Sequence, residues 1–140
     1  MGGLIYLLDS CIISEPTKKQ PNVRVMERLE QYDGSVCTSA TVWRELVYGI
    51  EKMEACAKRK ALEAYMQTLE DRGLLVIAFD KEAANWLGKE SARASDNGIT
   101  IPMADGEIAA VAFVNNLVVA TRNLDHFKLC QGVKVENWFL

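Results

Sequence analysis

Two acidic residues follow apolar segments that are predicted to be strands. The stretch YLLDSCIIS places Asp9 directly after the apolar run 4–8, and VVATRNLDHF places Asp125 shortly after the run 117–121. Short continuous apolar runs are typical of strands in parallel sheets that helices cover on both faces. In open α/β sheets the ligand crevice lies outside the carboxyl ends of the strands. A carboxylate at either position is therefore placed to act on a ligand, although Asp9 could equally be the N-cap of a helix.

Two further carboxylates are predicted to lie on helices. Glu45 lies beside the apolar stripe of its helix, where burial would partly desolvate it unless its side chain turns outward or pairs with Arg44 or Arg72. Asp105 falls in the first turn of a helix that begins near Pro102 and is apolar on every side. The helix dipole stabilises an anion there, so the acid could serve the helix alone. Four separate segments nevertheless offer acids where an α/β crevice would gather them.

Convergence of these carboxylates would require a positive counter-charge. Like charges within about 4–6 Å strongly disfavour joint ionisation. Mg²⁺ is the economical solution, because it prefers oxygen ligands, keeps several waters and is usually shared with substrate phosphates. The pattern therefore favours metal-assisted hydrolysis of a phosphodiester. Glu107, two residues after Asp105, is predicted at the rim of this site rather than at its centre.

The composition narrows the class of protein. A length of 140 residues, with 49% hydrophobic and 25% charged residues, predicts one globular domain spanning residues 1–140. No apolar run approaches the ~18–20 residues of a membrane span, and no signal segment is seen at the N-terminus, so we expect a cytoplasmic protein without membrane contact. Four cysteines without C-x-x-C spacing and a single histidine, His126, disfavour a Cys/His zinc site and a Ser/His/Asp triad. The net charge of −3 means that nucleic-acid binding would need a local basic rim.

Predicted strands alternate with predicted helices along the chain, which is the order of an α/β protein with a mostly parallel sheet of four to five strands. The predicted strands are 4–8, 35–39, 74–79, 117–121 and 133–137. The predicted helices are 22–34, 40–53, 56–73, 81–94 and 102–114, with a short helix or turn at 123–129. Ser39 and Asp80 are the expected N-caps of two of these helices.

The segments that carry the acids resemble, in order, the four motifs of PIN-domain ribonucleases of the VapC toxin type. They are YLLDSCIIS, TSATVWRELVYGI, GITIPMADGEIAAVA and LVVATRNLDHF, and the C-terminal VKVENWF is also typical of that family. The resemblance spans Tyr6 to Trp138 and implies a PIN-like three-layer α/β/α fold. It also implies a Mg²⁺- or Mn²⁺-dependent endoribonuclease that cleaves tRNA or another structured RNA. Such proteins typically form a homodimer and are inhibited by a small cognate antitoxin protein.

The resemblance also implies a role for each matching residue. Three residues would hold the metal and its water: Asp9, Glu45 and Asp105. Glu45 or Asp125 could orient or deprotonate the water that attacks the phosphorus, and the sequence leaves both candidates open. Asn123 and Thr121 would order the loop after the fourth strand. Ser10 would replace the Thr of the first motif.

Two positions depart from the family pattern. Cys11 stands where the first motif usually has Asn, and His126 stands where the fourth motif often has an acid. A fourth carboxylate and a strong second metal site are therefore not expected. Both departures keep open the alternative of a catalytically weakened PIN fold that acts as a partner-binding module. A further alternative is another Mg²⁺-dependent α/β phosphohydrolase, although the class with a covalent Asp nucleophile wants a second Asp where this chain has Cys11.

A local basic rim, if present, would come from a few side chains near these motifs. The candidate contacts to an RNA backbone are Arg122, Arg44, Lys18 and Lys19. Ordinary solvated surface charge is the competing interpretation for each lysine.

Overall fold

The computed structural model describes residues 3–140, which fold around one sheet of five parallel strands. The strands are β1 (Tyr6–Leu8), β2 (Val36–Ser39), β3 (Leu75–Ile77), β4 (Val118–Thr121) and β5 (Val135–Asn137), and they lie in the order β3-β2-β1-β4-β5. Every neighbouring pair is parallel. The predicted α/β class and all five predicted strands are confirmed, although each strand is shorter than predicted.

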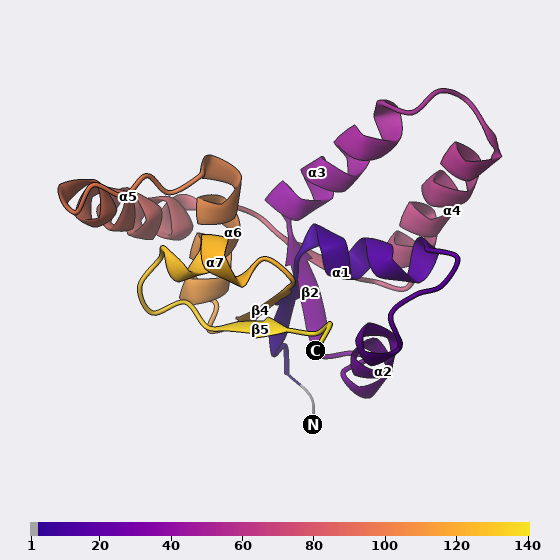
Figure 1. The fold of residues 1–140 in the computed structure, drawn as a ribbon, viewed down its shortest axis with the longest axis horizontal. Helices are drawn as coiled ribbons and strands as arrows, with labels where there is room; N and C mark the ends of the chain where they lie inside the picture. The colour runs from indigo at the N-terminus through magenta and orange to yellow at the C-terminus, as the bar shows by residue number, and fades with distance from the viewer. Residues whose placement is uncertain (1–2) are drawn as a thin grey trace.

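Helices cover both faces of this sheet (Figure 1). They are α1 (Ser10–Ser14), a 3₁₀ turn η1 (Glu15–Thr17), α2 (Val23–Gln31), α3 (Ala40–Glu51), α4 (Ala57–Asp71), α5 (Lys81–Asp96), α6 (Met103–Val114) and α7 (Leu124–Lys128). Figure 1 shows α1 to α4 on one side of the strands and α5 to α7 on the other. Right-handed crossovers require this division, because the chain moves toward β3 in its first half and toward β5 in its second. The predicted three-layer α/β/α architecture is confirmed.

The direction of the chain reverses between β1 and β4, which lie side by side at the centre of the sheet. The connection after β1 leads toward β2, and the connection after β4 leads toward β5. Such a switch point opens a crevice at the carboxyl ends of the two strands. Asp9 and Thr121 lie at these ends, and the backbone N–H of Asp9 donates to the carbonyl of Ala120 at 3.0 Å. The topology therefore places these two residues at the crevice.

Local caps explain where most helices begin. The side chains of Ser39 and Asp80 accept backbone N–H bonds from Val42 (3.3 Å) and Ala83 (2.9 Å), so both predicted N-caps are confirmed. One predicted end was wrong: α2 ends at Gln31 rather than at Gly34. Gly34 instead adopts a left-handed conformation, with φ of 83°, in the turn that leads into β2.

The predicted burial of α6 is confirmed. Its residues Ile108 to Ala112 are buried on every side, between α5 and the sheet. A helix with apolar residues all round can only be stable in such a place. Its position matters because its first turn carries Asp105. Within residues 3–140, every helix is too short or too polar to cross a lipid bilayer.

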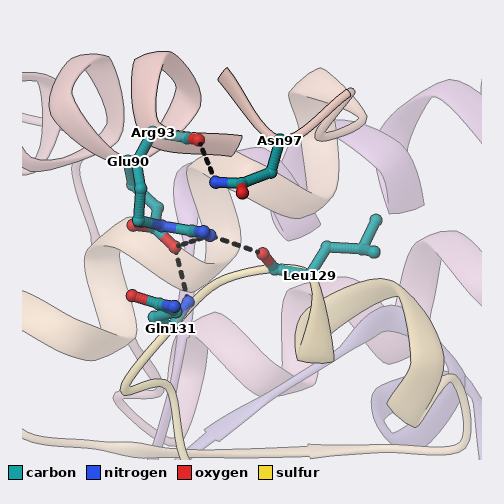
Figure 2. Close-up of polar contacts among 5 residues, drawn as sticks. All are labelled: Glu90, Arg93, Asn97, Leu129 and Gln131. Carbon is teal, nitrogen blue, oxygen red and sulfur yellow. Dashed lines mark hydrogen bonds and ion pairs between the residues drawn. The ribbon is translucent and has the colours of Figure 1, made fainter. Parts of the chain in front are cut away.

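A buried ion pair fastens α5 to the segment that follows α7 (Figure 2). Glu90 is only 8% exposed, and both its carboxylate oxygens accept from the guanidinium of Arg93, at 2.8 and 2.9 Å. Glu90 also accepts the backbone N–H of Gln131, and Arg93 donates to the carbonyl of Leu129 at 3.2 Å. These bonds fix residues 129–131 against α5. Arg93 holds the pKa of the Glu90 carboxyl below its usual range, and the bond from Gln131 acts in the same direction.

Replacing Glu90 with Gln is expected to lower the free energy of unfolding by about 1.5–3 kcal/mol at neutral pH, the usual size of bonds to a charged group. Because the pKa of Glu90 is lower in the folded state, its contribution is complete above the ordinary Glu value of 4.5. It disappears as the pH falls through the lower folded value. Urea unfolding of wild type and Glu90→Gln at pH 7 and at pH 3 measures this. The difference in unfolding free energy between the two proteins should shrink at pH 3. As a control, Glu82→Gln, at an exposed position of α5, should have an unfolding free energy within about 0.5 kcal/mol of wild type. An equal gap at both pH values would contradict the assignment.

Candidate functional site

Asp9 is held rigidly at the end of β1. Its side chain is 6% exposed, its Oδ1 accepts the backbone N–H of Ser10 at 2.8 Å, and its Oδ2 accepts the hydroxyl of Thr121 at 2.7 Å. Asp9 is therefore the N-cap of α1, which confirms that interpretation, and it also lies at the crevice, where its action on a ligand stays a prediction. Burial raises the pKa of Asp9 in spite of these two bonds, and the charge of Asp105 raises it further.

Thr121 connects Asp9 to the loop after β4. Its hydroxyl donates to Asp9 and accepts the backbone N–H of Asn123 at 2.9 Å, so one fully buried oxygen orders both the carboxylate and the loop. The sulfur of Cys11 lies 3.8 Å from the same oxygen. Burial raises the pKa of the Cys11 thiol, which keeps it neutral beside Asp9.

Glu45 and Asp105 lie within electrostatic range of Asp9. Burial raises the pKa of Glu45, and the negative charges of Asp9 and Asp105 raise it further, while Arg44 opposes them. Within residues 3–140, Glu45 forms no ion pair with an arginine. The alternative in which an arginine neutralises Glu45 therefore has no support. Asp9 after β1, Glu45 of α3 and Asp105 of α6 lie near enough to one another for their charges to act on the pKa values of Asp9 and Glu45.

Two contacts fix how the helices of the site meet. Glu107 accepts the hydroxyl of Thr41 at 2.9 Å, which joins the second turn of α6 to the first turn of α3. Asp105 forms an ion pair with His126 of α7, with Oδ2 and Nδ1 separated by 3.2 Å. Glu107 thus lies beside the carboxylates as a bridge between helices. Sequence reasoning did not single out Thr41, which carries no distinctive signal, and it treated His126 only as a departure from the family pattern.

Asp125 is not gathered with the other carboxylates. It is exposed and borders a surface hollow of about 290 Å³, together with Arg122, Asn123 and His126. It has no recorded influence on the pKa of Asp9 or of Glu45. In the same hollow, the guanidinium of Arg122 lies 3.7 Å from the ring centre of Phe139.

The candidate basic contacts differ in their availability. Arg122 is exposed, and its stacking on Phe139 limits its motion without neutralising it. Lys18 instead pairs with the buried Glu15, at 2.9 Å between Nζ and Oε1. Arg44 and Lys19 are exposed. Arg122 is therefore the candidate that is both available and preorganised near the carboxylates.

The donor set fits a hard divalent cation. Carboxylate oxygens are the ligands that Mg²⁺ and Mn²⁺ prefer. Burial raises the pKa of Asp9 and of Glu45, neighbouring negative charges raise it further, and a bound cation would oppose both effects. Within the described part of the chain, no three acidic, histidine or cysteine side chains are already close enough together to hold a metal ion. The side chains of Glu45 and Asp105 would therefore have to turn toward a cation as it binds.

An apolar groove of about 300 Å³ opens beside Glu45. Its apolar lining comes from α3, α4 and the loop between them: Leu46, Ile50, Met53, Leu62 and Met66. Ser10 and Glu45 lie on its wall, so the groove reaches the carboxylates.

A family profile and individual relatives of known name both match this chain over most of its length. The sequence profile of the PIN domain matches residues 6–131. The chain is 30% identical over 136 residues to the tRNA(fMet)-specific endonuclease VapC of Salmonella typhimurium, covering 96% of this chain and 98% of that protein. It is 35% identical over 129 residues to Toxin FitB of Neisseria gonorrhoeae, covering 88% of this chain and 91% of that toxin.

Solved structures agree with these relatives. The structure described as FitAB bound to an IR36 DNA fragment contains a chain that matches with a TM-score of 0.87 and 31% identity, covering 97% of this chain and 96% of that one. A chain of the DNA-bound VapBC from Salmonella typhimurium matches with a TM-score of 0.81 and 30% identity, covering 96% of this chain and 98% of that one. Together with the parallel sheet and its carboxylate crevice, these matches show that the chain belongs to the PIN-domain family.

Proposed function

We propose that residues 1–140 form one PIN-like nuclease domain, a metal-dependent endoribonuclease that is the toxin component of a toxin–antitoxin pair. The observation that carries this proposal is the grouping of acids at the switch point of the sheet, where the negative charge of Asp105 adds to burial in raising the pKa of Asp9 and of Glu45. Relatives that match nearly the whole chain are ribonucleases of the VapC type. We propose tRNA or another structured RNA as the substrate, which would place the protein in the cytoplasm.

Asp9, Glu45 and Asp105 would hold a Mg²⁺ or Mn²⁺ ion. When bound, such a cation would lower the pKa of a coordinated water and offset charge on the phosphoryl oxygens. Asp9 is the fixed member of the set, because Thr121 and the N–H of Ser10 hold both its oxygens. The other two members approach from α3 and α6, and the bond between Thr41 and Glu107 holds these two helices together.

The protein's own residues would move the proton and orient the RNA. Glu45 lies within electrostatic range of Asp9 and Asp105, whereas Asp125 is exposed in the hollow beside Arg122, which favours Glu45 over Asp125 for the proton of the attacking water. Arg122 is exposed and stacked on Phe139, so it would contact a phosphate of the backbone. The ordered loop at Asn123 would keep that guanidinium at the edge of the crevice.

Cleavage of a mixed tRNA pool by the purified protein tests this function. The expected result is cutting with Mg²⁺ or Mn²⁺ that stops when EDTA is added. No cutting with either metal, in a sample that is folded by circular dichroism, would overturn the nuclease proposal. It would favour the alternative of a partner-binding PIN fold, which the Cys11 and His126 departures suggest.

We further propose that a small antitoxin occupies the groove beside Glu45. The groove is apolar along α3 and α4 and ends at unbalanced carboxylates, which suits an apolar segment carrying one basic side chain. Several structural relatives are described as complexes of toxin with antitoxin, some of them with DNA. A homodimer is also proposed for this chain, and light scattering of the purified protein measures it.

The charge part of the antitoxin proposal predicts an effect of the site carboxylates on binding. The double substitution Asp9→Ala/Asp105→Ala should lower the affinity for a co-expressed cognate antitoxin by about tenfold or more. The reason is that losing one partner of a buried charge pair costs about 2–5 kcal/mol of binding free energy. The matched control is Glu82→Ala/Asp96→Ala, which removes two exposed charges from α5. Equal affinity of the site variant and the control in a calorimetric titration would show that no basic side chain enters the site.

A further inference from the structure

His126 is the single histidine of the sequence, and it lies against a proposed metal ligand. Its Nδ1 is 3.2 Å from Oδ2 of Asp105, and its charge also acts on Asp9. The side chain is 56% exposed, so packing does not account for its position. It occupies the place where the resembling motif often carries an acid, which would add one more oxygen ligand.

The backbone beneath His126 is fixed from two sides. The next residue, Phe127, is fully buried and anchors α7 in the core. The segment after α7 is fastened by Arg93, through the carbonyl of Leu129, and by Glu90, through the N–H of Gln131 (Figure 2). The imidazole is therefore presented to Asp105 by a rigid support rather than by a mobile loop.

The two atoms are close enough to become neighbouring ligands of one ion, since ligand atoms about 2.1 Å from an octahedral cation lie about 3 Å from each other. Nδ1 and Oδ2 are in direct contact at 3.2 Å, so both side chains would rotate to aim these atoms at the cation. The chemistry of the pair is less suited to Mg²⁺, which takes oxygen ligands and water. Imidazole nitrogen is a better ligand for first-row transition metals.

We infer that His126 is a nitrogen ligand of the divalent cation held at Asp105, and that it gives this site a preference for Mn²⁺ over Mg²⁺. This inference rests on the proposed function, which supplies the reason to expect a cation. The inference goes beyond the proposed function because it assigns a mixed nitrogen and oxygen ligand set to this chain. An acid at position 126 would give an all-oxygen set without that preference.

Pulsed electron paramagnetic resonance of Mn²⁺ bound to untagged protein tests the ligand directly. Because the sequence has one histidine, labelling with ¹⁵N-histidine changes the nitrogen at His126 and nowhere else. The expected result is a ¹⁴N modulation in unlabelled protein that is replaced by a ¹⁵N signal after labelling and is absent from His126→Asp. A modulation that labelling leaves unchanged, or no modulation at all, would overturn the inference and reduce His126 to an ion-pair partner.

Metal affinities give the second measurement. His126→Asp should weaken Mn²⁺ binding relative to Mg²⁺ binding by about tenfold or more, since losses of this size follow even from outer-shell changes at metal sites. Asp125→Asn, the adjacent exposed position, is the matched control and should leave the ratio unchanged. An unchanged Mn²⁺/Mg²⁺ ratio in His126→Asp would also overturn the inference. RNA cleavage by the wild type, measured separately, shows whether the nuclease proposal survives such a result.

Discussion

Asp105→Asn is expected to reduce RNA cleavage by about 10²–10³-fold, the rate equivalent of losing several kcal/mol of charge stabilisation by a metal ion. The substitution keeps the size of the side chain and removes one of the three charges that face the crevice. The buried part of α6 begins just after this residue, so the helix itself should be unaffected. Single-turnover cleavage of the tRNA pool at saturating protein measures the change.

The free energy of unfolding of the same variant is expected to lie within about 1 kcal/mol of the wild-type value, because two effects oppose each other. The variant loses a partly exposed ion pair with His126, which is worth about 0–1 kcal/mol. It also removes a repulsion that raises the pKa of both Asp9 and Glu45. Asp125→Asn is the control and should retain cleavage, since Asp125 is exposed and does not contribute to the pKa shift of Asp9 or of Glu45. Wild-type cleavage by Asp105→Asn, or equal loss in Asp125→Asn, would contradict the assignment.

Thr121→Val is expected to damage both stability and cleavage. Valine fills the same space but leaves Asp9 without one donor and the N–H of Asn123 without its acceptor. Asp9 is buried whereas Asn123 is exposed, so the loss at Asp9 dominates. An unsatisfied buried group costs about 1–3 kcal/mol, and the free energy of unfolding should fall by a similar amount. Cleavage should fall by about tenfold or more, because Asp9 is no longer oriented and the loop that carries Arg122 is released.

Thr121→Ser separates this explanation from a simple packing effect. Serine keeps the hydroxyl and loses only a methyl group, so it should recover most of the cleavage lost in Thr121→Val while still unfolding slightly more easily than wild type. Cleavage that follows side-chain volume, with the serine variant as poor as the valine variant, would contradict the role of the hydroxyl. Urea unfolding and cleavage are measured on the same preparations.

The fold was largely predictable because local signals agreed with the global arrangement. Short apolar runs alternate with amphipathic segments, and polar caps such as Ser39 and Asp80 mark helix starts. The helix α1 and the turn η1 were not predicted beyond a possible cap at Asp9, because five and three residues are too few to show a period. The end of α2 was misplaced because Gly34 serves the following turn rather than the helix.

The members of the proposed site could be named from the sequence, and their roles as metal ligands stay predictions, but their contacts could not be predicted. Asp9, Glu45 and Asp105 follow from their places after a strand, beside an apolar stripe and in a first turn, and the structure brings them within electrostatic range. The bond from Thr41 to Glu107 and the pair of His126 with Asp105 depend on how α3, α6 and α7 pack. No periodicity in the sequence records such distances between separate elements.

The most direct test of the account is a calorimetric titration of Mn²⁺ into the wild type and into Asp9→Asn, Glu45→Gln and Asp105→Asn. Three carboxylates that share one cation predict a single ion per chain in the wild type. Each substitution should weaken its binding by about tenfold or more, as expected for disturbance of a metal site. Binding that is unchanged in any one of the three variants would remove that residue from the site, and unchanged binding in all three would contradict the account.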